Sequence, residues 1–66
     1  MDEIDVWRTA HLLLKEYGPE AALIAAKRAD ALYAQGELAG LKVWKRVVAA
    51  IAELERNTPR EGEVVN

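Results

Sequence analysis

The sequence predicts an all-α fold, a compact three-helix bundle with a disordered C-terminal tail. Three observations support this. Alanine, the residue with the highest helix propensity, is the commonest in the 66-residue chain. Apolar residues recur at helical spacing in three successive segments. Gly18-Pro19 and Gly36 interrupt that pattern between the segments, which is typical of helix ends.

The first helix is expected over residues 4–17. At about 100° per residue, its apolar side chains fall on one stripe. They are Val6, Trp7, Ala10, Leu13, Leu14 and Tyr17. Acidic residues at positions 2, 3 and 5 suit the positive end of the helix dipole. Gly18 then suits the helix end, and Pro19 suits the first position of the next helix.

The second helix is expected over residues 19–35, with a packed face made mainly of small side chains. That face comprises Ala22, Ala25, Ala29, Leu32 and Tyr33. Small residues let a neighbouring helix approach closely. Leu23 and Ile24 lie outside the stripe, so the chain's own core is not expected to cover these two large side chains.

The third helix is expected over residues 38–56, on a 4-3-4-3 apolar repeat suited to bundle packing. The repeat comprises Gly40, Trp44, Val47, Ile51 and Leu54. Gly40 suits either a flexible helix start or a close contact between helices. The pattern stops near Asn57, so we expect one domain over residues 1–56 and a flexible tail over 57–66.

Composition restricts the chemistry available to the chain. There is no cysteine and one histidine, which argues against disulfides, metal sites and thiol nucleophiles, and no cofactor is inferred. The net charge of −2 gives no general attraction to nucleic acid or anionic membranes. The acidic start argues against a secretory signal, and no apolar run approaches a membrane span, so a cytoplasmic location is expected.

The sequence also argues against an enzyme. His11 lies at the edge of the first apolar stripe, and no hydroxyl nucleophile shares its side of that helix. Gly36 and Gly40 lack the preceding strand and the Lys-Ser/Thr pair of a phosphate-binding loop. We therefore predict no catalytic residues and infer no small-molecule substrate.

The glycines and tryptophans also carry a family resemblance. The pattern comprises Trp7, Ala10, Tyr17-Gly18, Ala22, Arg28-Ala29-Asp30, Leu32, Gly36, Gly40, Trp44 and Val48. It resembles a family of short, mainly proteobacterial helical proteins, known as a domain of unknown function. The resemblance covers roughly residues 5–54. It implies a bacterial origin and a small helical fold, and it implies no activity.

Two functional hypotheses remain. The first is a non-catalytic protein–protein interaction module that is able to self-associate into homo-oligomers, since large apolar residues fall off the main stripes. These candidate interface residues are Leu12, Leu23, Ile24 and Val43. The alternative is a small DNA-binding or regulatory domain in which the second helix, the glycine turn and the third helix form a helix-turn-helix. Its candidate basic patch is Lys42, Lys45 and Arg46, but the apolar third helix makes nucleic acid the less favoured partner.

Overall fold

The computed structural model describes residues 2–57, and this part of the chain is compact and all-helical. Its elements are α1 (Glu3–Tyr17), the 3₁₀ helix η1 (Gly18–Glu20), α2 (Ala21–Ala34) and α3 (Leu38–Asn57). The all-α prediction is confirmed. The predicted tail from residue 58 onward lies outside the described residues, and Asn57 is the last residue of α3 rather than the first of the tail.

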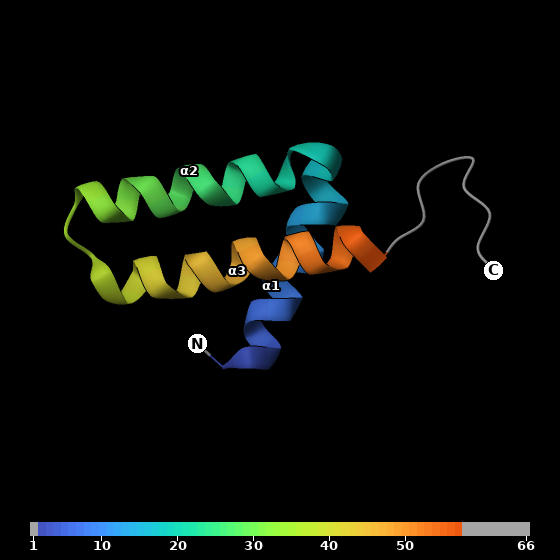
Figure 1. Ribbon diagram of the computed structural model, residues 1–66, viewed down its shortest axis with the longest axis horizontal. Coiled ribbons are helices and arrows are strands. Elements are labelled where there is room, and N and C mark those ends of the chain that lie inside the picture. The colour runs from blue at the N-terminus through green and yellow to red at the C-terminus, as the bar shows by residue number, and fades with distance from the viewer. Residues whose placement is uncertain (1, 58–66) are drawn as a thin grey trace.

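Helices α2 and α3 form an antiparallel hairpin, and α1 crosses it at one end (Figure 1). The most extensive packing is between α2 and α3, followed by that between α1 and α3. The other end of the hairpin comprises the last turns of α2, residues 35–37 and the first turns of α3. This hairpin end extends beyond α1 (Figure 1).

The connection between α1 and α2 differs from the sequence prediction. Residues 18–20 form a 3₁₀ turn, so α2 begins at Ala21 and not at Pro19. Gly18 adopts a positive φ of 56° and donates its backbone N–H to the Leu14 carbonyl. The Ala21 N–H then bonds to the Gly18 carbonyl, the i→i+3 pattern of a 3₁₀ turn. The tight turn redirects the chain before a regular helix resumes.

The turn between α2 and α3 is a Schellman motif centred on Gly36. Gly36 has a φ of 74° and donates its N–H to the Tyr33 carbonyl at 3.0 Å. The Glu37 N–H donates to the Leu32 carbonyl at 2.9 Å. These bonds satisfy carbonyls left free at the end of α2, and they require a left-handed residue at position 36. Gln35 is accordingly the cap of α2 and not part of the predicted helix.

We expect Gly36→Ala to lower the free energy of unfolding by about 1 kcal/mol, because an L side chain is strained at this φ. A Cβ at position 36 would meet no atom within 4 Å, so the cost is conformational and not steric. Urea unfolding followed by circular dichroism measures it. Gly36→Asn is the matched control and should lose less, since asparagine tolerates the left-handed region. Equal losses for alanine and asparagine would contradict this explanation.

The core is small and consists largely of alanine. The buried apolar residues are Val6, Ala10, Ala21, Ala25, Ala29, Val47, Ala50 and Ile51. The buried residues of α2 are Ala21, Ala25 and Ala29, which confirms packing through small side chains on this helix. Ala22 of the predicted face is only half-buried. Leu32 packs so closely on Gly40 that a Cβ there would lie 3.3 Å from Leu32 Cδ2. Gly40 is therefore a close-packing position within α3.

Some residues of the predicted stripes are not buried. Tyr33 is 70% exposed and Tyr17 is 43% exposed. Tyr33 lies near the end of α2, in the part of the hairpin that α1 does not reach (Figure 1). Trp7 and Trp44 pack against the core but are only half-buried. Helical periodicity identified the apolar side of each helix, but a side chain is buried only where another helix covers it.

Candidate interaction surface

The four predicted interface residues differ in exposure. Leu12 is 59% exposed and Leu23 is 55% exposed, whereas Ile24 and Val43 are half-buried. Each leucine follows a fully buried alanine by two residues, about 200° around its helix, so each points away from the core. Leu12 is on α1 and Leu23 is on α2, and neither of the two pockets described below includes any of the four. That the four form one interface stays a prediction.

The structure adds exposed apolar side chains that the sequence analysis missed. Ile4 is 69% exposed in the first turn of α1, and Leu38 is 60% exposed at the start of α3. Leu38 and the exposed Tyr33 are on either side of the turn at residues 35–37, so both are at the hairpin end. No sequence signal separates Tyr33 from the core residues of α2, because a side chain on an apolar stripe is buried only where another helix covers it.

More large apolar side chains are exposed than fully buried in the described part of the chain. The exposed ones among the described residues are Ile4, Leu12, Tyr17, Leu23, Tyr33 and Leu38. Within residues 2–57, the fully buried ones apart from alanine are Val6, Val47 and Ile51. Other large apolar side chains pack partly buried against this core: Trp7, Leu13, Leu14, Trp44, Val48 and Leu54. Single exposed apolar residues are normal on a protein surface. A contiguous group of exposed apolar side chains is the kind of surface that interaction sites use.

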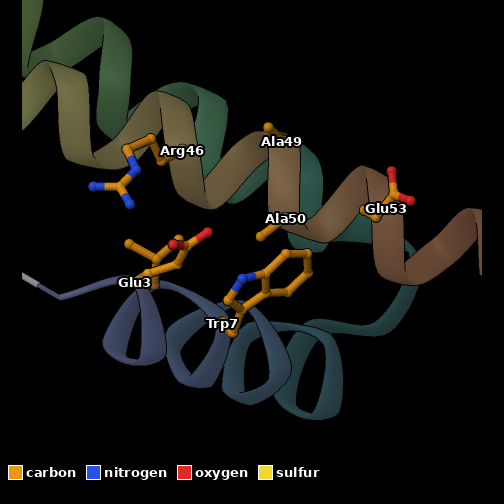
Figure 2. A pocket seen from close by; sticks show the side chains of 7 residues that line it. Glu3, Trp7, Arg46, Ala49, Ala50 and Glu53 are labelled. Atoms are coloured by element: carbon orange, nitrogen blue, oxygen red, sulfur yellow. The ribbon is translucent and has the colours of Figure 1, made fainter.

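An open groove of about 460 Å³ runs between α1 and α3. We call it the Trp7 groove; it is lined by Glu3, Val6, Trp7, Arg46, Ala49, Ala50 and Glu53. Figure 2 shows the Trp7 indole beneath Ala50, with its nitrogen on the side of Glu3 and Arg46. The floor is therefore apolar and aromatic, and the charged side chains stand at the rim.

The basic patch is exposed, and it forms no ion pair with the other described residues. Lys42, Lys45 and Arg46 are all exposed on α3. In the described part of the chain the ion pairs are Arg8–Asp5 at 3.9 Å and Arg56–Glu53 at 2.8 Å, and neither involves the patch. The Glu3 carboxylate lies on the same side of the groove as the Arg46 guanidinium (Figure 2), although the two form no ion pair.

A second pocket of about 380 Å³ contains the single histidine. Its lining residues are His11, Leu14, Lys15, Leu54 and Glu55. Neither this pocket nor the Trp7 groove is lined by a serine, threonine or cysteine that could act as a nucleophile. Over residues 2–57, no group of three or more His, Cys, Asp or Glu side chains is placed to hold a metal ion.

Arg28 of α2 contacts the aromatic ring of Trp44 on α3 and so joins the two hairpin helices. Its guanidinium carbon lies 5.4 Å from the centroid of the Trp44 ring, within range of a cation–π interaction. The contact links α2 to α3. It also covers one side of an indole that the small core leaves half-exposed.

Arg28→Ala should lower the free energy of unfolding by about 0.5–1 kcal/mol, because it removes the cation from the Trp44 ring and uncovers that ring. Urea unfolding measures the loss. The control is Lys27→Ala, which removes a neighbouring exposed cation that contacts no ring in the structure. A loss of the same size in both variants would show that the Trp44 contact does not contribute.

Comparisons with known proteins identified no relative. No protein-family model matches the chain, and no curated protein or solved structure shows significant similarity to it. No helix in residues 2–57 has both the length and the hydropathy needed to cross a membrane.

Proposed function

We propose that this chain is a three-helix bundle that acts in the cytoplasm as a non-catalytic protein–protein interaction module, with self-association as one form of that interaction. The observation that carries the proposal is that six large apolar side chains are exposed over residues 2–57, more than are fully buried there. Membership of the short proteobacterial family suggested by the Trp7 and Trp44 pattern is part of the same proposal, and it adds no activity.

The energetics of a small core support this function. A single core in a chain of this size supplies only about 3–5 kcal/mol of stability. Here that core is mostly alanine, which contributes little buried area per residue. Covering Leu12, Leu23 or the hairpin-end pair Tyr33 and Leu38 with a partner would bury further apolar area and stabilise the fold.

Replacing both outward leucines, Leu12→Ser and Leu23→Ser, should weaken association without unfolding the chain, because both side chains are more than half exposed. Sedimentation velocity and affinity capture from cell lysate measure association, and circular dichroism checks folding. The control is Lys15→Ser with Lys27→Ser, which changes exposed charged positions on the same two helices. A wild-type chain that stays monomeric at high micromolar concentration and captures no protein would contradict the proposal.

Nucleic-acid binding is the second candidate, because Lys42, Lys45 and Arg46 are exposed on one helix and form no ion pair within residues 2–57. Binding through these cations should weaken steeply as salt rises, since it releases counterions from the phosphates. A gel-shift titration with duplex DNA at low salt, repeated with Lys42→Ala/Lys45→Ala, tests the idea. Absence of a shift at low salt would remove it.

A further inference from the structure

Three cations in the first half of α3 have no opposite charge beside them on the helix. Lys42 is three residues before Lys45 and four before Arg46, so like charges are neighbours on the helix surface. The other positions three and four residues away hold apolar side chains, and none of the three cations forms an ion pair within residues 2–57. Such a cluster destabilises an isolated helix, so helix stability does not explain it.

The rest of the outward face of α3 does not offset these charges. Arg56 is eleven residues after Lys45, about 20° around the helix, so it lies on the same side. Its guanidinium pairs with the Glu53 carboxylate at 2.8 Å, and this pair is neutral as a whole. The outward face therefore keeps the three positive charges of Lys42, Lys45 and Arg46.

This basic face is local, because the charge of the chain is divided unevenly. From Lys27 to Arg46, the segment that forms the hairpin end, there are five basic and two acidic residues, a net charge of +3. The remaining described residues contain three basic and seven acidic residues, a net charge of −4. The overall negative charge thus does not describe the surface that a partner of α3 would meet.

The Trp7 groove lies directly beside the basic face. Arg46 lines the groove, and so does Ala49, which is exposed on the outward side of α3. Figure 2 shows the Trp7 indole and Ala50 in the groove, with Arg46 toward one end and Glu53 toward the other. At about 460 Å³, the groove has room for a large apolar side chain. A ligand on this face meets positive charge and an apolar groove side by side.

We propose that the partner of this face is an acidic segment of another protein. Its carboxylates lie over Lys42, Lys45 and Arg46, and one of its large apolar side chains fills the Trp7 groove. Charge complementarity selects an acidic partner, because carboxylates between the three cations replace their mutual repulsion with attraction. The inference rests on the proposed interaction function and states the chemistry of the partner.

A polypeptide fits this surface better than a nucleic acid does. From Leu38 to Arg56 there is no Asn, Gln, Ser or Thr, the uncharged side chains that commonly bond phosphates and base edges. Glu3 and Glu53 also line the groove, and both would repel a strand that carries a phosphate at every residue. A polypeptide can place carboxylates beside the cations and an apolar side chain between the two glutamates.

Selection from short random peptides displayed on phage tests the chemistry of the partner, with the purified chain as bait. We expect the enriched peptides to be acidic and to contain a large apolar residue. An enriched peptide labelled with fluorescein then gives dissociation constants by fluorescence anisotropy. Enrichment of basic or uncharged peptides, or no enrichment at all, would overturn the proposal.

Charge reversal places the bound peptide on α3. Lys45→Glu should weaken its binding about tenfold, because attraction becomes repulsion at an exposed position. Lys27→Glu is the matched control: Lys27 follows the buried Ala25 by two residues, so it points away from the core on α2. Circular dichroism checks that both variants stay folded. Equal losses in the two variants would indicate a general charge effect and count against the α3 face.

Ala49→Arg separates an apolar side chain in the groove from binding by charge alone. The substitution adds a cation to the basic face and puts a long side chain at the Trp7 groove. A peptide held only by charge would bind Ala49→Arg more tightly than wild type. A peptide with a side chain in the groove should bind it several-fold more weakly. Tighter binding would therefore overturn the proposed use of the groove.

The remaining outcomes separate this inference from the proposed function. Duplex DNA and phosphatidylserine vesicles are titrated in the same buffer, and tighter binding of either than of the peptide would overturn the acidic protein segment. A chain that self-associates but enriches no acidic peptide also overturns it, and leaves the interaction function standing. A chain that stays monomeric, captures no protein and enriches no peptide contradicts both.

Discussion

Ile51→Ala is expected to leave most of the chain unfolded at room temperature. Ile51 is fully buried, and with Val47 it is one of the two largest fully buried side chains. Truncating a buried isoleucine to alanine costs about 2–5 kcal/mol, from lost burial and from the cavity left behind. That cost is comparable to the whole stability of roughly 3–5 kcal/mol that a core of this size provides, so the variant retains little or no net stability.

Far-ultraviolet circular dichroism and urea titration measure this loss directly. Leu23→Ala is the matched control, because it removes comparable apolar volume from a side chain that is 55% exposed. Its free energy of unfolding should change by less than about 0.5 kcal/mol. If Ile51→Ala unfolded at nearly the wild-type urea concentration, the packing around α3 would not be the main source of stability.

Ala25→Leu is expected to destabilise the chain by about 1–3 kcal/mol or more, although leucine is an excellent helix former. Ala25 is fully buried in the core between the helices. The added side chain would have to displace neighbours or separate the helices, since interiors are close-packed. The loss would show that close approach, and not apolar character alone, determines this position.

Thermal and urea unfolding both measure the effect of Ala25→Leu. Ala31→Leu is the control, because Ala31 is exposed on the same helix. It should change stability by less than about 0.5 kcal/mol, as expected for a surface position with similar helix propensity. Equal stability of the two leucine variants would mean that α2 does not pack through its alanines.

The helical class and the helix ends depend on local chemistry, and they were predictable for that reason. Gly36 ends α2 because only a left-handed residue completes the two Schellman bonds to Leu32 and Tyr33. The start of α2 was misplaced by two residues, since Gly18-Pro19 favours a helix start but does not distinguish an α-helix from a 3₁₀ turn.

The interaction surface was predictable only in part. Leu12 and Leu23 lie outside their helices' apolar stripes, and the structure places both in solvent. Tyr33 lies on a stripe and is nevertheless exposed, and the Trp7 groove joins residues of α1 and α3 that are far apart in sequence. Periodicity within one helix contains no information about which part of that helix another one covers.

The sequence by itself therefore determined that the described chain is helical, where its helices end and that α2 packs through alanines. These properties follow from backbone propensity, turn geometry and side-chain size, which act within a few residues. The tertiary structure alone decided that α1 crosses only one end of the hairpin (Figure 1). That crossing leaves Tyr33 and Leu38 uncovered and forms the Trp7 groove, because burial depends on contacts between distant segments.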